Sequence, residues 1–307
     1  NYNTYLTDAS ITFKQLPVYI RAGMFKYPGS EEGFQAMFVS PFINFTSVSN
    51  QLMLERFVES SLSKPIQGVG GYRDLGIQLF QSYEIGNKSS LSLAYMIGNG
   101  SGVSYKNINN SHFTNYGYIA YEKILGKGKG YKQESYKIYA WMQDGKRKLL
   151  VNGVEELYNR NRYGIGFTYF HNGLRLESEY IKGSGMIMNG IKDTNLDQSK
   201  ETWELITAPS SENKANGYYL SSIYSLFDNF DILARYDVYN HMTNDDTQYK
   251  KFETYTAGFS YKFKNYNRID VNYAVNSVEA PHNSSVNDFL NSAVGNLLSV
   301  QLTMVFQ

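Results

Sequence analysis

Apolar and polar residues alternate along most of this chain with a period of two. In the clearest run, which is also the last, every second residue is apolar: Leu298, Val300, Leu302, Met304 and Phe306. The runs at 255–263 and 268–275 alternate in the same way. Successive side chains of a β-strand point to opposite faces, so this period predicts strands with one apolar face.

Similar alternation recurs from one end of the chain to the other. Ten further runs show it: 5–14, 18–27, 73–83, 89–98, 114–124, 134–143, 160–170, 174–182, 216–226 and 230–240. Together with the three C-terminal runs they predict about thirteen strands. A tilted strand needs roughly 9 to 11 residues to cross a bilayer, and these runs are long enough. In the run at 114–124 the alternation leaves open which of its two faces is the apolar one.

The polar faces of these strands carry both signs of charge. Seven residues are basic and five acidic: Arg21, Lys137, Arg162, Arg175, Arg235, Lys262 and Arg268, against Asp74, Glu177, Asp231, Asp237 and Asp270. A soluble sandwich would turn its apolar faces inward. A wide barrel in lipid does the opposite, with apolar side chains outside and a wet lumen, and so many charged strand faces favour the barrel.

The links between the runs alternate between short and long. The short links are Gln15–Pro17, Gly86–Lys88, His171–Gly173, Asp228–Asn229 and Asn265–Asn267, and the intermediate link at 125–132 occupies a short position. The long links are 28–72, 99–113, 144–159, 183–215, 241–250 and 279–296. This order is typical of an all-β, up-and-down antiparallel transmembrane barrel with short periplasmic turns and longer external loops. We therefore interpret 1–307 as a single barrel domain.

The strand number also leads to an expectation about the natural chain. Single-chain bacterial barrels have even strand numbers, so either an odd number of N-terminal strands is missing here or one strand lies within 28–72. We expect about sixteen strands in the natural protein. If the last strand ends in the periplasm, Asn1 lies on the external side. A barrel of that size leaves an aqueous channel.

Composition narrows the function classes. The chain has 28 Tyr, 18 Phe and no Cys; many aromatic residues suit the girdles of a membrane barrel, and the lack of cysteine removes thiolate chemistry, disulfides and cysteine-based metal sites. A net charge of +1 without a basic block argues against nucleic acid as a partner. No apolar run exceeds five residues, as at Ile138–Met142, so no spanning helix is expected.

The link at 28–72 is too long for a turn and contains an apolar stretch. Loops longer than about 12 to 15 residues are usually functional or disordered. Two interpretations carry equal weight: the segment folds into the lumen and constricts it, or it stays external, packed on its neighbours or at a subunit contact.

Several motifs in the first 125 residues resemble the phosphate-selective porins O and P and their wider relatives. The matching residues are Thr7-Asp8-Ala9-Ser10-Ile11, Ile20 to Pro28 followed by Glu31 and Glu32, Glu55-Arg56, Arg73 to Gln78, and Asn99-Gly100-Ser101-Gly102. The resemblance implies a sixteen-stranded homotrimeric barrel whose arginines and lysines select anions. The final Gln307, where the usual terminal residue is Phe, departs from the pattern.

The candidate pore-lining residues follow from the charge pattern and the long link. Besides the seven basic residues on strand faces, Lys26, Arg56 and Arg73 border the link at 28–72. A surplus of two basic residues on the strand faces predicts at most a weak anion preference, because strong selection needs a ring of like charges. Arg21→Glu or Arg56→Glu is expected to lower anion over cation permeability.

The predicted function is passive diffusion of small hydrophilic solutes, including anions such as phosphate, across a bacterial outer membrane. No cofactor is expected, and lipid is the expected surroundings. The alternative is a structural or surface-interaction barrel with a blocked lumen. An enzyme is not expected, because the four histidines lie in links or at their edges and Asn110-Ser111-His112 is the nearest approach to a hydrolase site. No His or carboxylate cluster has the spacing of a metal site.

Overall fold

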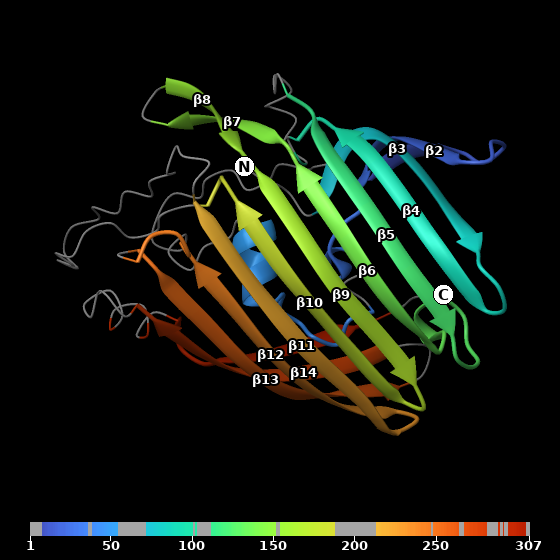
Figure 1. Ribbon diagram of the computed structural model, residues 1–307. Helices are drawn as coiled ribbons and strands as arrows, with labels where there is room; N and C mark the ends of the chain where they lie inside the picture. Colours follow the sequence, from blue (N-terminus) through green and yellow to red (C-terminus); the bar gives the residue numbers. More distant parts are fainter. Residues whose placement is uncertain are drawn as a thin grey trace.

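In the computed structural model, the strands predicted from the alternating side chains form one large antiparallel sheet (Figure 1). The structure describes residues 8–35, 39–54, 72–100, 102, 112–151, 154–187, 213–246, 248–263, 267–280, 288, 291 and 294–304. Each strand of the main sheet pairs with its neighbour in the sheet order, from β1 at one edge to β15 at the other, as expected for an up-and-down meander.

Within the described residues, thirteen strands form this sheet, the number that the alternation predicts. Their bounds are β1 Ala9–Phe13, β2 Tyr19–Lys26, β3 Arg73–Glu84, β4 Ser89–Gly98, β5 Thr114–Ile124, β6 Ser135–Asp144, β9 Asn161–His171, β10 Leu174–Ser184, β11 Lys214–Phe227, β12 Phe230–His241, β13 Lys250–Phe263, β14 Asn267–Glu279 and β15 Leu297–Thr303. The remaining elements are α1 Glu31–Phe34, the π-helical turn η1 Ser49–Met53, the 3₁₀ turn η4 Gly130–Lys132, and a separate hairpin of β7 Lys146–Val151 and β8 Val154–Asn159.

The β7–β8 hairpin is the clearest addition to the sequence-based expectation. It lies in the link at 144–159, which the alternation pattern assigns to a long loop. The hairpin extends beyond the ends of β6 and β9 and is not part of the main sheet (Figure 1). Among the described residues, no helix is long and apolar enough to cross a membrane.

Apolar side chains lie on the outer face of the sheet. Leu298, Val300, Leu302 and Met304 are 53–65% exposed, and Ile77 and Ile165 on distant strands are 58% and 57% exposed. So many large apolar side chains turned outward would be costly in water but are favourable in hydrocarbon. The orientation predicted from the sequence is therefore confirmed.

Charged and aromatic side chains lie on the inner face. Asp74, Arg162, Asp237 and Asp270 are fully buried there. In β5, whose apolar face the sequence leaves open, Tyr116 and Ala120 are buried while Ile119 is 47% exposed. The aromatic face of β5 therefore points inward.

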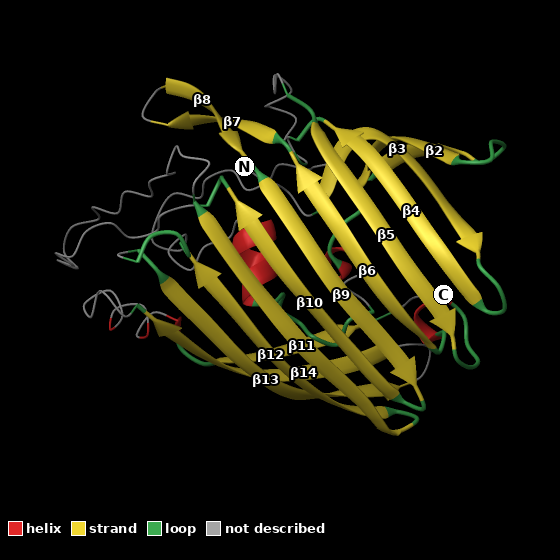
Figure 2. Ribbon diagram, in the orientation of Figure 1, coloured by secondary structure: helices red, strands yellow, loops and turns green. Residues whose placement is uncertain are grey.

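The sheet curls around residues 28–35 and 39–54, which we call the inner segment (Figure 2). This segment contains α1 and η1, drawn in red on the concave side of the sheet. Hydrogen bonds join it to strands that follow it by more than 200 residues, such as the bond from the Ile43 backbone N–H to Asn272 Oδ1 on β14. The described part of the long link therefore lies on the concave side of the sheet.

Candidate functional site

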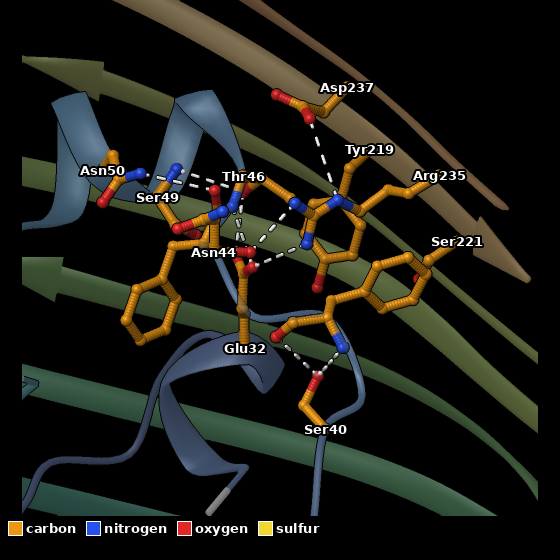
Figure 3. Close-up of polar contacts among 12 residues, drawn as sticks. Glu32, Ser40, Asn44, Thr46, Ser49, Asn50, Tyr219, Ser221, Arg235 and Asp237 are labelled. Carbon is orange, nitrogen blue, oxygen red and sulfur yellow. Dashed lines mark hydrogen bonds and ion pairs between the residues drawn. The ribbon is translucent and has the colours of Figure 1, made fainter. Parts of the chain in front are cut away.

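Arg235 on β12 is the centre of a charged network that binds the inner segment (Figure 3). Its Nη2 donates to the Asn44 carbonyl at 2.9 Å, and its Nη1 lies 3.6 Å from Glu32 Oε1. Glu32 in turn accepts hydrogen bonds from the backbone N–H and the hydroxyl of Thr46, at 2.9 and 2.7 Å. Hydrogen bonds to charged groups contribute about 1.5–3 kcal/mol each, so this network fixes the middle of the segment.

Two residues of β14 hold the preceding stretch of the segment. Arg268 donates to the carbonyls of Val39 and Ser40 and pairs with Asp270 at 2.8 Å. Asn272 donates to the Pro41 carbonyl at 3.2 Å and accepts the Ile43 N–H at 2.9 Å. Backbone groups that would be unsatisfied inside the sheet thus find partners on its inner face, as buried polar groups require.

Arg160 and Arg162 hold the other end of the segment. Arg162 is fully buried, and its Nε donates to the Leu52 carbonyl at 3.1 Å while its other nitrogens donate to the carbonyls of Asn161, Ser184, Gly185 and Met186. Arg160 Nη2 donates to the Met53 carbonyl at 3.2 Å. The sequence pattern places Arg162 among the pore-lining residues; in the structure it is buried and holds the Leu52 carbonyl of the segment.

Two adjacent inward carboxylates on β10 bind the first part of the segment. Glu179 accepts hydrogen bonds from Ser30 Oγ at 2.7 Å and from Trp141 Nε1 at 2.6 Å. Glu177 accepts from the Gln35 side chain, and the Tyr219 hydroxyl donates to Glu177 at 2.8 Å and lies 3.1 Å from Glu179. Both carboxylates therefore hold neighbouring side chains in position.

The contacts that β2–β6 make with the segment include aromatic rings as well as two lysines, Lys26 and Lys137. Phe34 of the segment meets Tyr118 edge-on with ring centroids 5.6 Å apart, and Tyr27, just before the segment, stacks on Tyr116 at 4.5 Å. Tyr139 and Trp141 on β6 are buried in the same cluster. We call the inward faces of β2–β6 the aromatic wall and those of β9–β14 the polar wall.

A cavity of about 770 Å³ lies between the inner segment and the polar wall. Six basic and four acidic residues line it: Lys129, Lys132, Arg175, Arg235, Lys262 and Arg268, with Glu32, Glu177, Asp228 and Asp231. Two of the lysines, Lys129 and Lys132, and one aspartate, Asp228, belong to links at one end of the sheet, so the cavity reaches the end where the short turns lie. Its volume suits a small solute, since ligand pockets measure about 300–1,000 Å³.

The turns at this end of the cavity are joined by Glu134. Its carboxylate accepts hydrogen bonds from the backbone N–H groups of Asn172 and Lys127, at 3.0 and 3.1 Å, and lies 3.6 Å from His171 Nδ1. The bond from Asn172, followed by that from Lys127, lowers the pKa of Glu134 below its usual range. The link that carries Lys129 and Lys132 is thereby fixed to the β9–β10 turn.

The other predicted pore residues are placed as follows. Lys137 pairs with Glu31 at 2.6 Å, and Lys26 donates to the Phe34 and Gln35 carbonyls, so both bind the inner segment. Arg21 donates to Thr12 and stacks on Phe25 and Phe80, and Arg73 pairs with Asp8 at 2.8 Å. Lys262 pairs with Asp231 at 2.6 Å, and Arg175 lies over the Phe170 ring. Arg56 lies outside the described residues.

Some residues of the site are not among the pore-lining residues predicted from the sequence. Glu179 lies two positions after Glu177, on the same face as Arg175 and Glu177, so the alternation could have identified it. Glu31 and Glu32 carry the family resemblance, but only the folded segment places them beside Lys137 and Arg235. Within the described part of the chain, no group of three or more His, Asp or Glu residues could hold a metal ion.

Comparisons with known proteins support the fold. No protein-family model matches the chain, and no curated protein sequence matches it significantly. Among solved structures, the anion-selective porin from Comamonas acidovorans superposes with a TM-score of 0.50 and 13% identity, covering 88% of this chain and 67% of that one. Outer-membrane expressed OmpT of Vibrio cholerae gives 0.53 and 10%, covering 89% and 71%. A trimer form of OmpT gives 0.53 and 11%, covering 91% and 72%. The chain has the fold of bacterial outer-membrane β-barrels.

Proposed function

We propose that this chain works in the bacterial outer membrane as a porin, through which small hydrophilic solutes diffuse passively and anions pass slightly more easily than cations. The observation that carries the proposal is the charged cavity on the concave side of a sheet whose convex side is apolar. A wet, charged interior inside an apolar exterior is the arrangement of a pore-forming barrel.

The proposed anion preference is weak. Six basic residues face four acidic ones in the cavity, and several of the basic groups are engaged with the inner segment or with carboxylates. The fold is similar to that of a porin described as anion-selective, and the early motifs resemble porins that select phosphate. We therefore propose phosphate as the first anion to test, and a homotrimer as the assembly.

Reversal potentials in planar bilayers test the proposal. Purified protein should form ion-permeable channels whose anion-to-cation permeability ratio is modestly above one in a potassium chloride gradient. Phosphate is then added as a competitor. Block at micromolar concentration would support selective phosphate uptake, whereas unaffected chloride conductance would limit the protein to general diffusion. A ratio below one would refute the anion preference.

A second function is favoured by one specific observation. The inner segment packs so closely on both walls that Val48, Leu52 and Met53 are at most 1% exposed. This supports the alternative of a barrel with a blocked lumen, which serves as a structural element or presents external loops to a partner. Absence of channels from folded, membrane-inserted protein would favour this alternative over the porin.

Catalysis is not part of the proposal. The lumenal carboxylates Glu177, Glu179 and Asp237 each bind a neighbouring side chain or backbone group of the protein. They act as positioning groups in this arrangement. A hydrolysis assay with peptide and ester substrates on the purified barrel would reveal an activity that contradicts this assignment.

A further inference from the structure

The helical turn of the inner segment lies across four neighbouring strands of the polar wall. Residues 47–53 are helical, and successive contacts along them step from β12 to β11, β10 and β9. At the start, the Ser47 backbone N–H donates to Asp237 Oδ1 on β12 at 2.7 Å. At the end, the carbonyls of Leu52 and Met53 accept from Arg162 on β9 and from Arg160 just before it.

Two glycines let the middle of the turn approach the sheet. A Cβ added at Gly217 on β11 would lie 2.9 Å from Val48 Cβ, and one at Gly183 on β10 would lie 2.7 Å from Leu52 Cδ1. Distances under 3.0 Å are closer than real Cβ atoms come, so the Val48 and Leu52 side chains occupy the space that larger residues would fill. Val48 is 0% exposed and Leu52 1% exposed as a result.

The groups at the two ends match the unsatisfied backbone groups of a helix. The first N–H groups of a helical turn lack partners within it, as do the last carbonyls. Here a carboxylate accepts at the start and two guanidinium groups donate at the end, which is also the favourable arrangement of charges. Cradle, glycines and end groups thus fit one occupant, the turn at 47–53.

We infer that β9–β12 form a cradle that fixes residues 47–53 against the wall, and that Asp237 and Arg162 are positioning residues of the pore that do not bind ions. The cradle itself stands on the contacts above. The further claim that it sets the width of the passage rests on the proposed porin function.

The chain offers a clean way to test the cradle, because it contains no native cysteine. Val48→Cys places a single thiol under the turn, where it should react slowly with a maleimide. In that background, Asp237→Ala removes the acceptor for Ser47 and should raise the labelling rate by at least about tenfold, the effect of losing one hydrogen bond to a charged group. Asp237→Asn keeps an oxygen acceptor and should restore most of the protection.

Asp231→Ala is the matched control for labelling. Asp231 lies on the same face of β12, is 5% exposed, and its hydrogen bond and ion pair go to Ser225 and Lys262. Its loss should leave the introduced thiol protected. Equal labelling rates in the Asp237→Ala and Asp231→Ala proteins would overturn the cradle. If Asp237→Ala does not fold, Arg162→Lys, which cannot serve the same carbonyls, makes the same comparison from the other end.

Conductance separates the two parts of the inference. In a conducting protein, Asp237→Ala should raise single-channel conductance, because a released turn no longer narrows the passage. Faster labelling with unchanged conductance would overturn the claim about width. A protein that conducts in no variant contradicts the porin proposal, while the labelling comparison still decides the cradle.

Discussion

The two walls that hold the inner segment differ in how they do so. The aromatic wall packs rings against it, as where Tyr118 meets Phe34 edge-on, and adds the lysine contacts of Lys26 and Lys137. The polar wall binds its backbone and its acidic side chains through residues such as Arg235 and Arg268. The cavity lies on the polar side, and the rings of Tyr116, Tyr139 and Trp141 are not part of its lining.

This difference between the two walls indicates which side of the lumen can hold water. Closely packed rings leave no space for water and stabilise by burying apolar area. Polar side chains on the inner face need hydrogen-bond partners. Where the inner segment does not supply these partners, water or a solute can supply them. The aromatic wall therefore supports the segment, and we expect solute to pass along the polar wall.

The largest expected effect comes from breaking the aromatic wall. Tyr116→Ala removes a ring that is 2% exposed, and loss of a buried aromatic side chain costs about 3–5 kcal/mol of the free energy of unfolding. Urea unfolding of the barrel in lipid vesicles measures it. Tyr116→Phe loses only the hydroxyl bond to the Asp74 carboxylate and should cost less, about 1.5–3 kcal/mol. Equal losses in both variants would show that ring packing contributes little.

A somewhat smaller loss is expected on the polar wall. Arg235→Met leaves the carboxylates of Glu32 and Asp237 without their neighbouring cation, which should lower the free energy of unfolding by about 2–3 kcal/mol. Adding Glu32→Gln should recover part of this loss, because one uncompensated charge is removed. If the double variant is no more stable than the sum of the two single losses predicts, Arg235 and Glu32 are not coupled as the structure implies.

Ion selectivity should respond to charge on one wall more than on the other. Arg175 lines the cavity, whereas Arg21 on β2 does not. A charge in water acts on an ion about 4 Å away with roughly 1 kcal/mol, so Arg175→Glu should lower the anion-to-cation permeability ratio about two- to fivefold. Arg21→Glu, expected from sequence to act in the same way, should change it less. Reversal potentials compare the two variants, and a larger shift for Arg21→Glu would place the passage along the aromatic wall.

The smallest effect concerns the rim of the cavity. The pKa of Glu134 is lowered by the Asn172 and Lys127 N–H groups. The ionised carboxylate therefore stabilises these turns fully at pH values above the ordinary carboxyl pKa, and this stabilisation is lost as the pH falls through the lowered pKa. Hydrogen exchange at the Asn172 amide, corrected for the intrinsic rate, should show protection that fades in acid. Glu134→Gln should have weak protection at every pH. If the protection of the Asn172 amide were the same in acid and in the Glu134→Gln variant, the hydrogen bond from Asn172 to Glu134 would be excluded.

Much of the architecture follows from the sequence because it depends on neighbouring residues. A strand shows alternate residues to opposite faces, so the thirteen strands and the outward position of Leu298 and Val300 could be predicted locally. β5 could not be oriented in this way, because Tyr and Ile occur on its two faces; the choice depended on Phe34 and Tyr27, which pack against Tyr118 and Tyr116.

The sequence by itself determined the strands of the main sheet, the apolar faces of all of them but β5, and most of the charges that turn inward. Only the tertiary structure decided what those charges do. Arg268 and Ser40 are 228 residues apart in the chain, yet they form a hydrogen bond, and Arg162 is fully buried by partners that no spacing reveals. Period and propensity are properties of a short stretch, whereas the partner of a charged side chain depends on how a distant segment folds back through the sheet.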